Sequence, residues 1–398
     1  MHRRTLLRLA AALFCAPGGL RLIADGRSQD PGNPDWILIG SLLPRGAGGD
    51  EALAASARMG ATLGVEEASR AASMLGRRLD GRVVDYEDAE AAARAARELF
   101  VRGAVAVAAA GDEAACAAIS REAAGTGRTF FNLANPAGSL RSERHPATLS
   151  IGASETMLAA AAVAWVVGKE GRRRWFLLAA GDERASSGQL AEVRSRLLAA
   201  GGAIAGEAVV ADAGDAAAAF DRIGRSADVA FACGPLAARV AVAGAYAARR
   251  RRFGLAGIGE GDGVIDYPAA GSWVVPWHHA LERYGAGQLN ARFRQRFGRE
   301  MTGAAWSAWL APKLVSDTLL RRGSSRASLL HLLTVDSARF DGHKGQGLAF
   351  GEDRQLNQPL YAVTRDRPGA GSPAVHEIPM DENDTRLPQV SRPSAASR

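Results

Sequence analysis

Residues 37–86 have the pattern of one complete β-α-β unit. An apolar run, 37–44, leads into a glycine-containing loop, 45–49, which is followed by a helical stretch and a second strand ending at Tyr86. In open α/β sheets, the loops at the carboxyl ends of such strands are where ligands bind. The glycine loop lacks the Lys-Ser/Thr pair of a phosphate-binding Walker loop. The unit therefore predicts a ligand-binding α/β protein without nucleotide chemistry.

Strand and helix patterns alternate from Trp36 to about Ala362, which is typical of a doubly wound α/β protein. Short apolar runs are expected to be buried parallel strands at 105–108, 129–132, 175–178, 229–232 and 255–258. Alanine-rich segments with helical spacing are expected to be helices at 88–101, 113–124, 189–200 and 236–250. These β-α units are too many for one domain of ordinary size, so the sequence predicts two lobes.

The chain is expected to cross between the two lobes three times, near 148–152, 272–276 and 342–350. Lobe 1 would then comprise 35–150 plus 276–342, and lobe 2 would comprise 151–275 plus 343–366.

Helices at 278–297 and 304–322 are expected to return the chain to lobe 1 after the second crossing. A last strand is expected at 360–364. The tail, 367–398, is rich in Pro, Ser, Asp and Glu, and we expect it to be disordered.

The first residues have the features of an export signal. A charged start containing Arg3 and Arg4 precedes a short apolar core, 9–14. The core is far shorter than the roughly 20 residues that span a bilayer, so a permanent anchor is not expected. The arginine pair resembles a twin-arginine signal, and the Sec route stays open. We expect 1–28 to be a cleaved signal peptide and the mature protein to be periplasmic.

Two cysteines, Cys116 and Cys233, remain after that cleavage. Export permits a disulfide. The two residues fall in different predicted lobes, however, one on a helix and one at a strand end. We therefore expect two buried free thiols.

No catalytic, metal-binding or cofactor-binding constellation is recognisable in the sequence. The glycine-dense stretch 257–263 follows a late strand and opens no clear helix, so it is a weak dinucleotide fingerprint. His278 and His279 are adjacent and cannot point to one face as metal ligands, and we interpret them as the first turn of a helix. We expect no catalytic residues, no metal and no cofactor, and we expect that the protein is not an enzyme.

The net charge of +7 arises from 49 basic and 42 acidic residues. The arginines are scattered rather than clustered with aromatic residues, so no nucleic-acid partner is expected. Three tryptophans need an interpretation. Trp306 and Trp309 have the i, i+3 spacing of a packed helix face and are expected in the core. Trp277 follows a proline at a predicted crossing, where a pocket wall and a structural role are both open.

Several motifs occur in a characteristic order along the chain, at 40–44, 60–68, 76–79, 130–136, 340–345 and 355–360. This order resembles the type I periplasmic solute-binding proteins of ABC transporters, in the leucine/isoleucine/valine-binding branch, and covers almost all of the mature chain. The resemblance implies two Rossmann-like lobes joined by three hinge crossings that close on a small-molecule ligand. It also implies ABC transporter membrane subunits as partners, and we expect a monomer.

A narrower likeness lies in Trp277-His278 and in 288–293, 299–302 and 306–311. These segments are similar to the subfamily associated with pyrroloquinoline-quinone (PQQ)-dependent alcohol dehydrogenase systems. The likeness implies a role in periplasmic alcohol oxidation, with a periplasmic dehydrogenase as a further partner.

The sequence departs from the amino-acid binders of the branch at the ligand loops. Glu113 stands where those proteins offer a serine hydroxyl to the ligand carboxylate. In the next loop a Thr or Ser hydroxyl is usual two residues after a small residue, whereas here Ala134 is followed by Asn135-Pro136. A charged Glu113 repels a carboxylate in a partly desolvated cleft. Glu260 falls where an acidic residue often receives the ligand ammonium group. A standard α-amino acid is therefore not the expected ligand.

The resemblance places ten residues in contact with ligand. The first lobe would supply Pro44, Glu113, Asn132, Ala134 and Asn135, and the second lobe and the crossings would supply Ser154, Ser186, Gly234, Glu260 and Trp277. Asn and Ser are also favoured as turn and cap residues, so a local structural role is open for each.

Two other functions are weighed against solute binding for transport. A doubly wound enzyme would need a nucleotide fingerprint or a poised nucleophile, and the sequence offers neither. A periplasmic sensor, or an accessory subunit of a dehydrogenase system without a transport role, is favoured somewhat by the altered anion loops.

Overall fold

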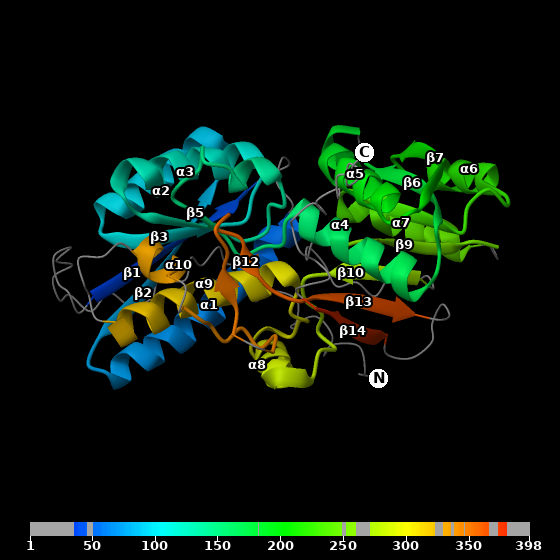
Figure 1. Cartoon of the computed structure of the whole chain (residues 1–398). Coiled ribbons are helices and arrows are strands. Elements are labelled where there is room, and N and C mark those ends of the chain that lie inside the picture. Colours follow the sequence, from blue (N-terminus) through cyan, green and yellow to red (C-terminus); the bar gives the residue numbers. More distant parts are fainter. Residues whose placement is uncertain are drawn as a thin grey trace, which may run out of the picture. The chain divides into compact units, whose positions relative to one another are not determined.

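The computed structural model describes residues 36–45, 51–181, 183–248, 252–259, 271–322, 329–335, 338–345, 347–365 and 373–379, apart from the side chains of 183–186 and 322. Two open sheets with helices on their faces make up this part of the chain (Figure 1). We call the part built on the five-stranded sheet lobe 1 and the part built on the seven-stranded sheet lobe 2.

The sheet of lobe 1 is entirely parallel and has the order β2-β1-β3-β4-β5. Its strands are β1 (Trp36–Pro44), β2 (Arg78–Tyr86), β3 (Ala104–Ala109), β4 (Thr129–Asn132) and β5 (Thr148–Ser150). Both of its faces are buried. Along β1, Ile37 and Ile39 belong to one hydrophobic cluster and Leu38 and Leu42 to another. This alternation explains why the strand reads as an uninterrupted apolar run.

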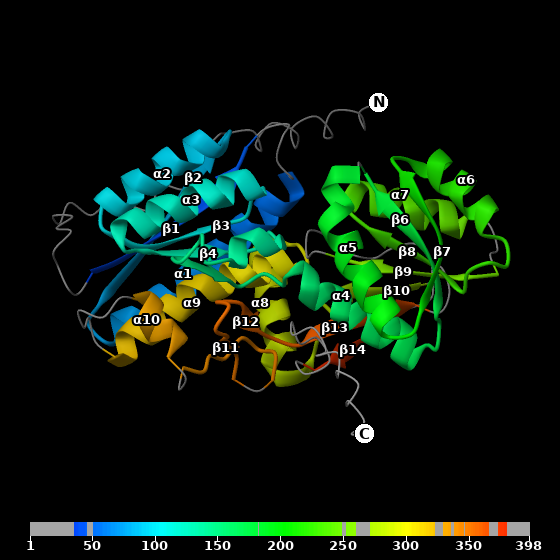
Figure 2. The ribbon, with the colours of Figure 1, turned by 45° about the horizontal axis from the view of Figure 1, so that its top comes forward.

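Helices cover the two faces of this sheet. The helices are α1 (Glu51–Met74), α2 (Ala89–Val101), α3 (Glu113–Thr126) and, from later in the chain, α8 (Ala286–Phe297), α9 (Gly303–Arg322) and α10 (Leu329–Thr334). α2 packs against α3, and α1 packs along α9, which lies beside it in both views (Figures 1 and 2).

α1 and α9 approach so closely because α1 carries Gly60 and Gly64 on the contact face. A Cβ atom at Gly60 would overlap the carbonyl oxygen of Ala305 in α9, and one at Gly64 would lie 2.5 Å from the carbonyl oxygen of Trp309. The two indoles of α9, Trp306 and Trp309, are 0% and 1% exposed, which confirms that they belong to the core.

The sheet of lobe 2 has the order β14-β13-β10-β9-β8-β6-β7. Its strands are β6 (Arg174–Ala180), β7 (Ala203–Val210), β8 (Val229–Cys233), β9 (Gly254–Ile258), β10 (Gly271–Val275), β13 (Leu360–Arg365) and β14 (Ala374–Ile378). β6 to β10 are parallel, whereas β13 and β14 join antiparallel at one edge.

The helices of lobe 2 either lead from β5 of lobe 1 to β6 or connect consecutive parallel strands of lobe 2. They are α4 (Glu155–Val163), the π-helical continuation η2 (Ala164–Lys169), α5 (Glu183–Ala199), α6 (Ala213–Ile223) and α7 (Leu236–Ala247). Short elements complete the described chain: the 3₁₀ turns η1 (Gly138–Arg141) and η3 (Arg283–Gly285), and the pair β11 (Ala349–Phe350) with β12 (Leu356–Asn357). None of the described helices is long and apolar enough to cross a membrane.

The five buried parallel strands and the four alanine-rich helices predicted between residues 88 and 258 lie within or overlap elements of the structure, and β4 coincides with its prediction at both ends. The doubly wound α/β class with two lobes is therefore confirmed. Cys116 and Cys233 are buried thiols that form no disulfide with each other, as expected.

Two expectations about the later part of the chain are wrong. The helix predicted from residue 278 begins only at Ala286, so His278 and His279 lie in a non-helical turn. The reason lies in the residues just before it: Tyr284 and Gly285 have left-handed φ angles of 57° and 80°, which a continuous right-handed helix does not accommodate. The tail expected to be disordered contains β14, which pairs with β13.

Candidate functional site

The carboxyl ends of the parallel strands carry the loops in which a ligand site is expected. In lobe 1 these loops follow β3 and β4, and in lobe 2 they follow β6, β8 and β9. In both sheets the strand order reverses beside the first strand in sequence, between β1 and β3 and between β6 and β8, which is where crevices form in doubly wound folds.

The loop after β3 presents two carboxylates at the start of α3. Asp112 is the N-cap of α3, and its Oδ1 accepts a hydrogen bond of 2.7 Å from the backbone N–H of Ala115. The side chain of Glu113 is exposed and accepts a hydrogen bond from the hydroxyl of Ser139. The backbone N–H of Ala115, a donor at this helix N-terminus, is thus already bound by the Asp112 carboxylate, and the carboxylate of Glu113 lies beside it.

The loop after β4 is built by its own asparagines. Asn132 is fully buried: its Oδ1 accepts from the N–H of Asn135 at 3.0 Å, and its Nδ2 donates to the carbonyl of Asn135 at 2.8 Å. Asn135 in turn donates from Nδ2 to the carbonyl of Gly111 at 3.0 Å and so connects this loop with the one after β3. Ala134, between them, is half-buried. The amides of both asparagines therefore shape the two loops.

Arg141, which the sequence reasoning missed, fixes the same loop to the first of three passages of the chain between the lobes. The first passage leads from β5 to α4, the second from β10 to α8 and the third from α10 to β13. Its guanidinium donates to the carbonyls of Ala137 and Gly152, at 2.8 and 3.0 Å, and to Oε1 of Gln355 at 2.6 Å. Burial lowers the pKa of Arg141 to about 10, so the side chain stays charged at neutral pH. No sequence signal marks this residue, because its partner Gln355 is distant in the chain.

Ser154 and Glu155 stand where the chain enters lobe 2. Ser154 is 3% exposed and caps α4, since its Oγ accepts from the N–H of Met157 at 3.1 Å. The N–H of Glu155 donates to the carbonyl of Pro136 in lobe 1 at 3.0 Å. Burial is the main cause that raises the pKa of the Glu155 carboxyl group. The Glu155 carboxylate lies against Gly188 of α5, where any Cβ atom would overlap it.

In lobe 2, the loop after β8 accepts a hydrogen bond from the buried guanidinium group of Arg239. Gly234 has a φ of 118°, and a Cβ atom there would overlap the carbonyl oxygen of Ala180, so glycine is required. Its own carbonyl accepts a hydrogen bond of 2.6 Å from Nε of Arg239, which is 0% exposed. Arg239 is the second residue missed from sequence, because an arginine in an alanine-rich helix gives no sign of burial.

Pro44 ends β1 and is half-buried. Trp277 is 3% exposed; its Nε1 donates to Oδ1 of Asn290 at 3.1 Å, and its ring stacks on Trp306 with the centroids 5.7 Å apart. Of the two interpretations left open for Trp277, these contacts favour the structural one. Glu260 and the side chain of Ser186 lie outside the described residues.

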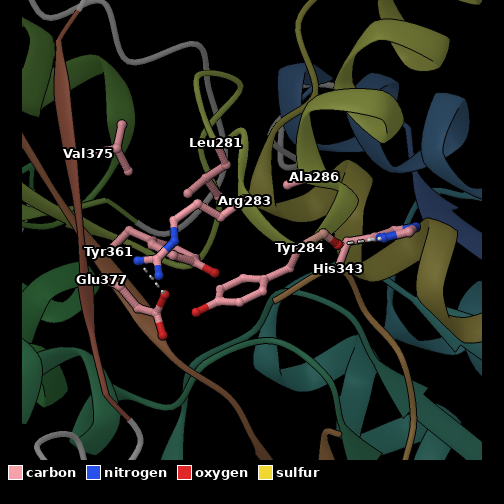
Figure 3. A pocket seen from close by; sticks show the side chains of 8 residues that line it. All are labelled: Leu281, Arg283, Tyr284, Ala286, His343, Tyr361, Val375 and Glu377. Carbon is pink, nitrogen blue, oxygen red and sulfur yellow. Dashed lines mark hydrogen bonds and ion pairs between the residues drawn. The ribbon is translucent and has the colours of Figure 1, made fainter. Parts of the chain in front are cut away.

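The cavities in the described part of the chain include the following two. One of about 40 Å³ lies between the segment that contains Tyr284 and strands β13 and β14; there Arg283 faces Glu377 at 3.9 Å, and His343 contacts the carbonyl of Tyr284 at 3.1 Å (Figure 3). The other, of about 220 Å³, lies at α9 and α10. None of the ten predicted ligand contacts lines either cavity. The described residues contain no group of three or more side chains suited to hold a metal ion.

His278 gives a testable pH dependence beside the second passage between the lobes. Its Nδ1 accepts from the N–H of Ala280 at 3.1 Å, and burial lowers the pKa of the imidazole to about 3. The folded protein keeps the ring neutral, whereas the unfolded chain protonates it below about pH 6.5. Stability that is present above that pH is therefore lost as the pH falls towards 3.

His278→Asn retains an acceptor for Ala280 and cannot titrate in this range. Between about pH 7.5 and pH 5, we expect the free energy of unfolding to fall by about 2 kcal/mol less in this variant than in wild type. Urea unfolding of both proteins at the two pH values measures this difference. Burial also lowers the pKa of His145, but this residue is present in both proteins, so its contribution to the pH dependence is the same in each. An equal loss in wild type and variant would show that His278 is protonated in the folded state.

Two α/β lobes, three passages of the chain between them, and polar loops at the strand ends define the architecture of a two-lobed binding protein. The chain belongs to the family of periplasmic binding proteins, whose sequence profile matches residues 37–370. This fold and family are those of solute-binding proteins rather than of enzymes. No curated protein sequence matches the chain significantly.

Solved structures share the fold at low sequence identity. An ABC transporter substrate-binding protein from Sphaerobacter thermophilus is 18% identical, with a TM-score of 0.76, and the match covers 88% of this chain and 100% of that one. A solute-binding protein from Rhodopseudomonas palustris in complex with 3,4-dihydroxybenzoic acid is 17% identical, with a TM-score of 0.71 and coverage of 87% and 97%. The branched-chain amino acid transporter substrate-binding protein from Streptococcus pneumoniae, in complex with isoleucine, is 18% identical, with a TM-score of 0.70 and coverage of 86% and 99%.

Proposed function

We propose that this protein captures a small polar ligand between its two lobes and passes it to the membrane subunits of an ABC transporter in the periplasm. Family membership supports the solute-binding role. The observation that carries the proposal is the pair of open sheets whose parallel strands end in polar loops. We further propose that the ten residues named from sequence lie in or beside the ligand cleft. Four of them stabilise the loops of the cleft through the hydrogen bonds that they make: Asn132, Asn135, Ser154 and Trp277.

The loop after β3 indicates which chemical group of a ligand can approach lobe 1. A ligand carboxylate at this position would meet Asp112 and Glu113, and two like charges 4 Å apart repel by about 4 kcal/mol at an effective dielectric constant of about 20. The ligand end at lobe 1 is therefore neutral or cationic, as in an alcohol-derived compound or an amine. Isoleucine and the aromatic acids found in the related structures carry a carboxylate.

The proposal includes a link to PQQ-dependent alcohol oxidation and export by the twin-arginine route. The first rests on the likeness of 288–293, 299–302 and 306–311 to that subfamily, and the second rests on Arg3 and Arg4. A sensor or accessory subunit of a dehydrogenase system is the second candidate function. The same carboxylates in the loop after β3 favour it, because they remove the usual anion receptor.

Thermal unfolding against a panel of compounds tests the function. We expect a raised midpoint with amines, polyamines or short alcohols and aldehydes, since a ligand at about one hundred times its dissociation constant adds about 2.7 kcal/mol. A shift with α-amino acids or benzoate-like acids alone would contradict the ligand class. If nothing in the panel shifts the midpoint, transport of these compounds is excluded, and co-purification with a dehydrogenase decides for the accessory role.

A charge variant sharpens this test. Glu113→Gln keeps an oxygen acceptor for Ser139 and removes the charge, so we expect a cationic ligand from the panel to bind about tenfold more weakly. Glu90→Gln is the matched control, because Glu90 lies on α2 in an exposed pair with Arg94. Equal affinities of the two variants would show that Glu113 does not face the ligand.

A further inference from the structure

A buried lysine lies where the three passages between the lobes meet. Lys344 is 1% exposed, and its Nζ donates to the carbonyl of Pro276, directly after β10. It also donates to Oε1 of Gln358, directly after β12, at 2.5 Å. Gln358 is 0% exposed and continues the connection, because its Nε2 donates to the carbonyl of Ile151, directly after β5, at 2.6 Å. One amine and one amide thus join three segments that are far apart in the sequence.

The surroundings of Lys344 hold the amine in place from both lobes. Its Nζ lies 3.8 Å from the ring centroid of Trp306 in α9 and 5.5 Å from that of Tyr361 in β13. Trp306 is itself fixed by a 2.9 Å hydrogen bond from its Nε1 to the carbonyl of Gly342. Burial lowers the pKa of Lys344, and the contacts described for it are carbonyl oxygens and aromatic rings.

Gln355, three residues before Gln358 in the third passage, makes a second connection of the same kind. Its Nε2 donates to the carbonyls of Ser150 and Gly152, at 3.2 and 3.0 Å, in the first passage. Its Oε1 accepts from Arg141, which holds the loop after β4. The first and third passages are therefore joined by the side chains of Gln355 and Gln358 and by a backbone hydrogen bond from Ser150 to Arg354. Lys344 connects the second passage to them through Pro276, beside the contact of His343 with the carbonyl of Tyr284.

We propose that Lys344 and Gln358 are positioning residues that join the three passages into one hinge and thereby set the equilibrium between open and closed lobes. Opening the lobes rotates the passages relative to one another, so any arrangement that separates Pro276, Lys344, Gln358 and Ile151 loses hydrogen bonds to buried groups. A lysine carries out this function better than an apolar residue of equal length, because only its amine reaches two carbonyl-type oxygens at once. This inference rests on the proposed solute-binding function in one respect: ligand capture is the reason why the protein would need open and closed states.

The test measures the distance between the lobes in the absence of ligand. Nitroxide labels go on cysteines introduced at Val101 in α2 and Leu198 in α5, which are 77% and 53% exposed, in the full chain carrying Cys15→Ser. Cys116 and Cys233 are buried and stay unlabelled. Pulsed electron resonance then gives the distribution of interlobe distances. For Lys344→Met we expect the ratio of open to closed populations to change about tenfold, the change that corresponds to losing about one hydrogen bond.

A second variant separates positioning from simple burial. Gln358→Glu gives Lys344 an ionic partner and removes the donor to Ile151. If the proposal holds, Gln358→Glu shifts the lobe populations in spite of the stronger pair with Lys344. If Lys344 needs only a buried partner, the populations of Gln358→Glu equal those of wild type, and the proposal is overturned.

Phe220→Leu is the control for stability alone, because Phe220 is buried wholly within lobe 2 beside Tyr246 and Phe253. Its distance distribution should match that of wild type. Unchanged populations in Lys344→Met would overturn the proposal, and if that variant does not fold, Gln358→Glu decides alone. Because no ligand is used, a negative result leaves the proposed function untouched, and a failed ligand panel leaves this test valid.

Discussion

Replacing Gly60 with alanine is expected to lower the free energy of unfolding by about 3 kcal/mol. The new Cβ atom would overlap the carbonyl oxygen of Ala305, and it would lie 2.7 and 2.8 Å from the carbonyl carbon and Cα atom of the same residue. These are backbone atoms of α9, which cannot rotate away as a side chain can. The two helices must separate, and the packing of Trp306 and Trp309 is disturbed with them. Urea unfolding measures the change.

Gly125→Ala is the matched control, because Gly125 also lies in a helix, α3, and a Cβ atom there meets nothing within 4 Å. The same substitution should stabilise at that position by up to about 1 kcal/mol, the difference in helix propensity. Opposite signs at the two glycines are therefore expected. Equal effects would mean that α1 and α9 are not in close contact in solution.

Replacing Arg141 with methionine should cost about 3 kcal/mol, because four hydrogen bonds from a charged group are lost together. The carbonyls of Asn135, Ala137 and Gly152 each keep a second donor. Oε1 of Gln355 has no other donor among the described residues and stays buried. We expect the loop after β4 and the first passage to loosen together, which amide hydrogen exchange around Gly152 would detect.

Arg97→Met serves as the control for this prediction. Arg97 makes a bidentate pair with Glu122 on the surface of lobe 1, and exposed pairs contribute little to stability. Unfolding of this variant should resemble that of wild type. Comparable losses in the two arginine variants would show that the contacts of Arg141 are as weak as those of a surface residue.

The sequence was most informative where burial is two-sided. β4 is buried along its whole length and carries one phenylalanine on each face, Phe130 and Phe131, and its limits were predicted at both ends. The tryptophan stripe of α9 was placed correctly in the core for the same reason. The predicted helix from His278 was wrong because apolar spacing says nothing about the left-handed residues Tyr284 and Gly285. β14 was missed because a strand with alternate exposed residues in a polar tail has little apolar signal.

The candidate site was less accessible to sequence reasoning. Residue type and position suggested Asn132 and Asn135 as ligand contacts, but both asparagines have neighbouring backbone partners that only a three-dimensional structure shows. No local sequence pattern marks the contacts of Arg141, Lys344 and Gln358, because their partners are distant in the chain. For Arg141 and Gln358 the partner is more than two hundred residues away. The role of Glu113 and the lobe boundaries given from sequence remain predictions.

The position of β13 and β14 at the edge of the second sheet determines when during synthesis each lobe can be finished. Lobe 1 needs α9, the packing partner of α1, and lobe 2 needs β13, which pairs with β10 across some ninety residues. Neither half can therefore be completed until most of the chain has left the ribosome. Such long-range pairing slows folding. The chain therefore stays unfolded for longer during its synthesis, and the relative rates of folding and export determine which of the two comes first.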